Sequence, residues 1–143
     1  MEHDLQIALD LFQEESLGLV IVKEGQVLYS GVEQRLLPLF KALEGLGERA
    51  WGSSVADKVI GRAAAMLLVC AEVKSCYSPL GSQGALEILQ SNHIPAHFEE
   101  VVPQILDTSG LRTCPMERLV DGITDPAEGR LKLCQFFQEH QLI

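Results

Sequence analysis

Apolar positions in the first thirty residues change from a helical spacing to the short runs typical of strands. In residues 4–15 they recur about every three or four positions, which places them on one side of a helix. Apolar runs rich in β-branched residues follow at 17–22 and 27–30. The residues between these runs include Gly25, which suits a tight turn. We therefore expect an N-terminal helix followed by a β-hairpin.

Two further helices are predicted in the middle of the chain. Residues 33–45 carry apolar side chains at helical spacing and end in glycine. Ser54 and Asp57 have the spacing of a capping box, so the next helix is expected over residues 55–72. Its apolar residues cover nearly the whole circumference, which indicates a helix buried in the centre of the domain.

The second half of the chain alternates strands with helices. The expected strands are 73–78 and 95–102, and the expected helices are 82–91, 115–123 and 125–139. Strands that alternate with helices usually pair in parallel through right-handed crossovers. The order predicts an α/β fold, a three-layer α/β/α sandwich on a mixed sheet. We expect a single domain over residues 1–143, with a core at about 17–128 and the helices at 4–15 and 125–139 as additions.

Composition narrows the class of protein. The chain has 143 residues, of which 47% are hydrophobic, and its formal net charge is −9. The apolar content argues against disorder. The scarcity of Lys and Arg argues against a nucleic acid polymer as partner, because such binding depends on neutralising phosphates.

Targeting segments and cysteines bear on where the protein is located. The N-terminus lacks the basic and apolar segments of a signal peptide, and the longest apolar stretch is too short to span a bilayer, so no membrane partner is expected. Four widely spaced cysteines without a CxxC motif indicate reduced thiols, and we predict a cytoplasmic protein with no cofactor.

Candidate chemistry is expected where loops meet helix N-termini at the carboxyl ends of the strands. Within the helix predicted from residue 55, Lys58 and Arg62 are four positions apart and share a face. A basic pair on an otherwise apolar helix suggests an anionic ligand, with Ser54 and Asp57 beside it. The alternatives are an internal ion pair or long side chains that reach solvent.

Two later segments are candidates for the same cleft. In the Gly-Ser-Gln-Gly turn at 81–84, Ser82 either helps backbone amides to bind an anion or simply caps the next helix. Cys114 is the expected N-cap of the helix that follows, and Glu117 is expected to accept a hydrogen bond from the backbone amide of that cap. A thiol at a helix N-terminus is a candidate nucleophile; the alternatives are a lining role in the cleft and simple burial.

Other candidate residues are less specific. His93 and His97 have the spacing of a metal-binding pair on a helix, but Pro95 lies between them, so no metal site is predicted. Trp51 suits either a stacking role at the mouth of the cleft or a place in the core.

The motif residues resemble a known family. The stretch from Ser54 to Ala65, together with Cys114 to Glu117, is similar to the prokaryotic family called domain of unknown function 1893, over roughly residues 17–128. The resemblance implies the α/β/α sandwich of the cytidine-deaminase-like superfamily. It also implies that the helix starts line the family's cleft, and the residues concerned are Asp57, Lys58, Arg62, Cys114 and Glu117.

The same resemblance bears on zinc. Zinc deaminases carry H-x-E or C-x-E at one helix start and P-C-x-x-C at the next. Here the first helix start lacks a His or Cys ligand, and the second, from Cys114, has one Cys in reversed order. Since a catalytic zinc site needs three protein ligands, the resemblance implies a branch without zinc.

These observations predict a small domain that binds a small anionic ligand, which could be nucleotide-like. Two alternatives stay open, a non-catalytic regulatory or protein-interaction module and an enzyme that uses Cys114 and Glu117. Apolar residues near the C-terminus could serve a homo-oligomer: Phe136, Phe137, Leu142 and Ile143.

Overall fold

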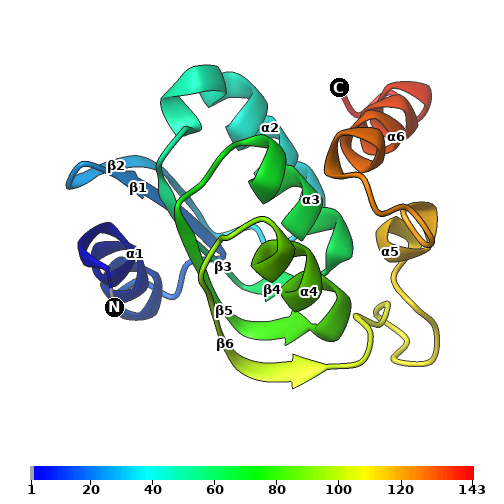
Figure 1. Cartoon of the computed structure of the whole chain (residues 1–143), viewed down its shortest axis with the longest axis horizontal. Coiled ribbons are helices and arrows are strands. Elements are labelled where there is room, and N and C mark those ends of the chain that lie inside the picture. The colour runs from blue at the N-terminus through cyan, green and yellow to red at the C-terminus, as the bar shows by residue number, and fades with distance from the viewer. Residues whose placement is uncertain (1) are drawn as a thin grey trace.

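Six strands form one mixed sheet in the computed structural model, which describes residues 2–143 (Figure 1). The strands are β1 (Leu19–Lys23), β2 (Gln26–Gly31), β3 (Ser54–Asp57), β4 (Val59–Ile60), β5 (Ser75–Ser82) and β6 (Ala96–Val102). The hairpin β1–β2 is antiparallel, and β3 pairs antiparallel with β1. Along β5, both β3 and then β4 pair in parallel on one side, while β6 pairs in parallel on the other. The predicted mixed sheet is confirmed.

Helices cover both faces of this sheet. They are α1 (His3–Glu14), α2 (Leu36–Leu46), α3 (Arg62–Cys70), α4 (Gln83–Ser91), α5 (Pro115–Leu119) and α6 (Pro126–Glu139), with a 3₁₀ turn, η1, at Gly47–Ala50. Figure 1 shows α1 on one side of the strands and α2, α3 and α4 on the other, which gives the predicted three layers. Outside them, α6 packs on α3, and α5 contacts both α3 and α6. Among the helices of residues 2–143, none has both the length and the hydropathy of a membrane-spanning segment.

One predicted helix is wrong in its first third. Residues 54–60 form β3 and β4, and α3 begins only at Arg62, with Gly61 as its N-cap. The strand β3 is buried along its whole length between β1 and β5, so its side chains show no alternation of polar and apolar positions. Without a clear period, such a buried segment fits a strand as well as a helix, and the neighbouring strands decide between them.

The strand β5 is longer than predicted. It continues through residues 79–82, where a loop was expected, because β4 and β6 both pair with that part of it. The side chain of Ser78 bonds to the backbone of its own strand. Its hydroxyl donates to the Leu80 carbonyl at 2.8 Å and accepts from the Leu80 amide at 3.1 Å. At this point β5 passes from pairing with β3 to pairing with β4. The sheet is thereby carried out to Ser82, the residue that begins α4.

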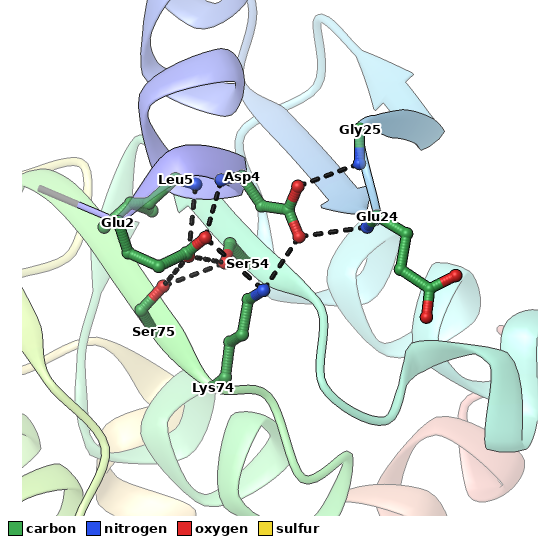
Figure 2. Close-up of polar contacts among 8 residues, drawn as sticks. All are labelled: Glu2, Asp4, Leu5, Glu24, Gly25, Ser54, Lys74 and Ser75. Atoms are coloured by element: carbon green, nitrogen blue, oxygen red, sulfur yellow. Dashed lines mark hydrogen bonds and ion pairs between the residues drawn. The ribbon is translucent and has the colours of Figure 1, made fainter.

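Glu2 attaches the start of α1 to the sheet (Figure 2). Its carboxylate accepts hydrogen bonds from Ser54 Oγ at 2.5 Å and from Ser75 Oγ at 3.0 Å, and it also caps the first turn of α1. Ser54 and Ser75 are the first residues of the parallel strands β3 and β5. The candidate ligand residue Ser54 therefore lies fully buried at the amino ends of these strands, away from the carboxyl ends.

Asp4, in the first turn of α1, makes a second set of contacts (Figure 2). Its carboxylate accepts hydrogen bonds from the backbone amides of Glu24 and Gly25, both at 2.9 Å, and from Lys74 Nζ at 2.8 Å. These bonds join α1 to the turn of the hairpin and to the loop before β5. The N-terminal helix is thus held by charge-assisted hydrogen bonds as well as by apolar packing.

These contacts predict that α1 is held less firmly in acid. Burial by itself would raise the pKa of Glu2, but hydrogen bonds from Ser54, the Asp4 amide, Ser75 and Lys74 lower it to about 2. The hydrogen bond from Lys74 likewise lowers the pKa of Asp4. Both folded-state values lie below the ordinary carboxyl range near 4. Their contribution to stability is therefore complete above about pH 4.5 and is lost as the pH falls toward about 2.

The variant Asp4→Asn tests this expectation. We expect it to lower the free energy of unfolding by about 1–2 kcal/mol at neutral pH, because it weakens three hydrogen bonds to a buried carboxylate. The deficit, measured by urea denaturation, should shrink as the pH is lowered below the ordinary carboxyl range near 4, because the Asp4 carboxylate is then protonated. Glu14→Gln, at the exposed end of α1, is the control and should change stability little. A deficit that is independent of pH would contradict the assignment.

Candidate functional site

A small cleft lies at the carboxyl ends of β5 and β6, between the N-termini of α3 and α4 and the helix α5. Its volume is about 190 Å³. The carboxyl ends of parallel strands, where helices begin, are the usual ligand sites of open α/β sheets. The residues that line the cleft are Arg62, Ser82, Gly84, Pro103, Gln104, Ile105, Thr113, Glu117, Arg118 and Asp121. Three candidates from the sequence, Arg62, Ser82 and Glu117, are thus brought together.

Arg62 is the first residue of α3, and its side chain crosses to the start of α4. A Cβ atom at Gly84 would lie 2.8 Å from Arg62 Cγ and 3.4 Å from Nη1, so the missing side chain of Gly84 leaves room for the arginine. Arg62 Nη2 donates a hydrogen bond to the carbonyl of Ile123. Arg62 Nε is buried and has no hydrogen-bond partner among residues 2–143. A buried N–H donor without an acceptor is rare in native proteins, so this one requires an explanation.

Glu117 caps α3 from a distant part of the chain. Its carboxylate accepts hydrogen bonds from the backbone amides of Arg62 at 2.6 Å and Ala63 at 2.8 Å. The predicted bond to the cap of its own helix is wrong, because Glu117 satisfies the N-terminus of α3 instead. A Cβ at Gly61 would lie 2.4 Å from Glu117 Oε1, so glycine at that position permits the contact. The negative carboxylate also complements the positive end of the α3 dipole.

Ser82 serves as a helix cap. It is buried, ends β5, and its Oγ accepts a hydrogen bond from the Ala85 amide at 3.0 Å. Of the two roles predicted for it, the capping role is confirmed. Ser82 also lines the cleft beside Arg62, so its hydroxyl is within the candidate site.

Asp57 and Lys58 do not join Arg62 in the cleft lining. Asp57 ends β3 and Lys58 stands between β3 and β4, so Lys58 and Arg62 are not one turn apart on a helix, and the predicted shared face is wrong. Burial raises the pKa of Asp57 to about 8, although the neighbouring amides of Lys58 and Val59 act in the opposite direction. Burial, with a smaller effect of Asp57, raises the pKa of Cys76 to about 12. Both side chains are buried, Asp57 at the end of β3 and Cys76 within β5.

Cys114 is the N-cap of α5, as predicted, but its thiol makes no capping hydrogen bond. The helix has only five residues, and Cys114 is not among the residues lining the cleft. Its backbone amide donates to the carbonyl of Ile105 at 2.9 Å, which fixes the loop before α5. Cys114 thus has a structural position next to the candidate site.

Several cleft residues were missed by sequence reasoning. Thr113 Oγ1 donates a hydrogen bond to Gln104 Oε1 at 2.8 Å, and Arg118 and Asp121 follow on or just after α5. The segment from 103 to 113 has no hydrophobic periodicity and contributes one isolated bridge, between Leu106 and Thr113. Of these residues, only Arg118 could have been found from the sequence, because it directly follows the candidate residue Glu117.

The side chains of this cleft do not fit a zinc site like that of the zinc deaminases. Zinc in proteins is held by Cys, His and carboxylate groups. The cleft lining contains neither Cys nor His, and the guanidinium of Arg62 lies between the two helix starts. The Glu117 carboxylate is already engaged by two amides. Across residues 2–143 no group of three or more His, Cys, Asp or Glu side chains could hold a metal ion.

Comparisons with known proteins agree with this fold. Residues 7–137 match the family model TM1506, domain of unknown function (DUF1893). A DUF1893 family protein (TM1506) from Thermotoga maritima has a similar crystal structure, with a TM-score of 0.88 and 26% identity over 96% of this chain and 92% of that one. No curated protein matches the sequence.

Two structures resemble the fold more distantly. RibD from Acinetobacter baumannii matches with a TM-score of 0.50 and 21% identity over 67% of this chain, which spans about a third (34%) of RibD. The dCMP deaminase of the cyanophage S-TIM5 matches with a TM-score of 0.47 and 16% identity over 67% of this chain and 94% of that one. The RibD likeness supports the predicted cytidine-deaminase-like fold. On the match of its sequence over residues 7–137, this chain belongs to the TM1506 family of domains of unknown function, DUF1893.

Proposed function

We propose that this protein binds a small anionic metabolite in the cleft between α3, α4 and α5, without a metal. The observation that carries the proposal is the buried Nε of Arg62, which has no acceptor within the described chain. An anionic oxygen in the cleft would provide that acceptor, and the resulting hydrogen bond would be charge-assisted. Arg118 is a second cation in the lining, and Ser82 and Thr113 contribute hydroxyl groups.

The size of the cleft favours a compact ligand. Pockets for drug-sized molecules measure about 300–1,000 Å³, whereas this cleft measures about 190 Å³. A free phosphate, a short phosphorylated compound or a small dicarboxylate is commensurate with that space. A nucleotide-like ligand would require the segment from 103 to 113 to move outward.

The Glu117 carboxylate restricts where an anionic ligand can bind in the cleft. The cleft already contains the Glu117 carboxylate, but its oxygens accept hydrogen bonds from two backbone amides on the α3 side. A ligand anion therefore approaches the guanidinium of Arg62 rather than the amides of α3. This division predicts that Arg62 and Arg118 control affinity, while Glu117 controls the stability of the site.

Ligand binding can be tested by thermal denaturation and calorimetric titration. Inorganic phosphate, malonate, succinate, glycerol phosphate and AMP form a graded series of anions. A ligand at about one hundred times its Kd should stabilise the fold by about 2.7 kcal/mol, which raises the melting temperature by several degrees. We expect Arg118→Gln to weaken binding about tenfold, since a charge-assisted hydrogen bond contributes about 1.5–3 kcal/mol.

Arg49→Gln is the matched control for this charge change, because Arg49 is exposed on η1 and outside the cleft. Arg62→Lys keeps the positive charge but removes the planar guanidinium, and should also weaken binding. If none of the anions stabilises the protein, or if Arg49→Gln and Arg118→Gln weaken binding equally, the proposed function is wrong.

The interaction-module alternative has less support. Phe137 is buried and Phe136 is partly buried, so only Leu142 and Ile143 of the four C-terminal apolar residues are well exposed. Homo-oligomerisation stays a prediction that light scattering can test. Cys114 lies outside the cleft lining, so the thiol-enzyme alternative has no observation in its favour.

A further inference from the structure

A second and larger groove lies at the other end of α3. The cleft described above is at the N-terminus of this helix, whereas the groove meets its last turn, the end of α2, the turn η1 and the start of α6. Its volume is about 590 Å³, within the range of small-molecule sites. The residues that line it are Phe40, Leu43, Glu44, Gly47, Glu48, Trp51, Leu67, Cys70, Ala71, Ala127 and Arg130.

The groove has an apolar floor and an aromatic rim. The floor is formed by the buried residues Phe40, Leu43 and Leu67, which belong to the main core. Trp51 follows η1 and is 46% exposed, although burial of tryptophan is strongly favourable. It therefore neither fills the core nor stands at the α3–α4 cleft, the two positions expected from the sequence. Its side chain is half-exposed in the lining of the groove.

The charge of the groove is negative on balance. Arg130 forms an ion pair with Glu44, so the one cation in the lining is already neutralised. Glu48 is exposed on η1 and has no salt-bridge partner within residues 2–143. Burial raises the pKa of the Cys70 thiol, Arg130 opposes that rise, and Asp125, the N-cap of α6, adds a smaller rise.

Two helix ends add to this negative potential. The last turns of α2 and α3 both line the groove, and neither contains a basic residue. The C-terminus of a helix carries a partial negative charge that favours a nearby cation. The aromatic side chain, the free carboxylate and these two helix ends favour a cation, while the N-terminus of α6, with Ala127 in the lining, acts in the opposite direction.

We propose that the groove between α2, η1, α3 and α6 binds a small organic cation with a flat apolar body, such as an arylalkylammonium ion. The ring lies over the apolar floor beside Trp51, and the ammonium group is held by Glu48 and the indole face. Cations within about 6 Å of a tryptophan ring are attracted to its face, most strongly for tryptophan among the aromatic side chains. This site is independent of the proposed anion cleft and does not rest on it.

The chain offers a direct reporter for this site, because Trp51 is its single tryptophan. Phenethylammonium and benzyltrimethylammonium chlorides are titrated while the fluorescence of Trp51 is followed. We expect a saturable change with both cations. The neutral 2-phenylethanol and the anionic 3-phenylpropionate, which have the same ring and a similar chain, should bind at least about fivefold more weakly, since cation–π and ion-pair contacts each contribute roughly 1 kcal/mol.

Two variants identify the groups involved. Glu48→Gln should weaken binding of phenethylammonium about two- to fivefold. Glu14→Gln removes the same charge from the exposed end of α1, on the opposite face of the sheet, and should leave binding unchanged. Trp51→Leu keeps an apolar rim without the aromatic face, and calorimetry should show a loss of about two- to fivefold.

Protection of Cys70 gives an independent readout, because this residue belongs to the groove lining. Bound phenethylammonium should slow alkylation of Cys70, measured by mass spectrometry of the labelled peptide, while leaving Cys114 unaffected. The proposal is overturned if neither cation changes the fluorescence of Trp51 in a saturable manner. It is equally overturned if 3-phenylpropionate binds as tightly as the cations, or if Glu48→Gln and Glu14→Gln have the same effect.

Discussion

Replacing Phe137 with alanine is expected to lower the free energy of unfolding by about 3–5 kcal/mol, as is usual for buried phenylalanine. Phe137 is 2% exposed, and its ring lies 5.1 Å from that of Phe40 on α2, centroid to centroid. The residue therefore fastens α6 to the helices that cover the sheet. Urea denaturation followed by circular dichroism measures the loss. A stable protein with unfolded residues 126–143 would show instead that α6 is an addition to the fold.

The neighbouring residue supplies a matched control. Phe136 is only partly buried, and its ring stacks on His140 with centroids 4.0 Å apart. Phe136→Ala removes the same atoms from a less buried position, so we expect a loss of about 1 kcal/mol. Equal losses in the two variants would contradict the assignment of Phe137 to the core.

Glu117→Ala is the second substitution with a large expected effect, a loss of about 2–4 kcal/mol. The change removes a buried carboxylate and leaves the amides of Arg62 and Ala63 without their acceptor. Unsatisfied buried amides each cost about 1–3 kcal/mol, and hydrogen bonds to charged groups are the stronger ones. The helix α3 also loses a negative charge at its N-terminus.

Glu117→Gln removes the negative charge of the side chain but keeps nearly the same shape. The amide oxygen of glutamine can still accept one of the two hydrogen bonds, so its loss should be about half that of the alanine variant. Glu128→Ala is the control, because Glu128 is also in the first turn of a helix but is exposed. It should cost less than about 1 kcal/mol. Faster hydrogen exchange of the Ala63 amide in Glu117→Ala, and not in Glu128→Ala, would locate the effect at the start of α3.

Elements with a clear local pattern were predictable from the sequence. The helices α1, α2, α4 and α6 and the hairpin β1–β2 lie within a few residues of their predicted positions. The hairpin turn at Glu24 and Gly25 has positive φ at both residues, which glycine readily adopts. In these segments the periodicity and the turn residues all favour one structure.

Residues 54–60 lacked such a pattern. The spacing of Ser54 and Asp57 imitates a capping box, and residues 59–71 are mostly apolar. In the structure Ser54 bonds Glu2 and Ser75, which belong to segments far from it in sequence. Ser54 therefore makes long-range contacts that a local helical motif does not reveal, and Asp57 is buried at the end of a central strand, β3.

The N-terminal helix also has a larger part in the fold than expected. Its apolar side, with Leu5, Ala8 and Phe12, forms a second core with β1, β3 and β5. Within residues 2–143 no other helix covers that face of the sheet. The helix α1 is therefore a full layer of the sandwich rather than an addition to it.

The sequence by itself determined the α/β class, the order of most elements and the family, because these depend on short-range periodicity and on motif residues. Only the tertiary structure decided which candidates meet. Arg62, Ser82 and Glu117 converge from three segments, and the contact of Glu117 with Arg62 spans 55 residues of chain. Such contacts follow from the parallel pairing of β4, β5 and β6, which brings their carboxyl ends together. No local pattern encodes that convergence, since it depends on strands and helices that are distant in the sequence.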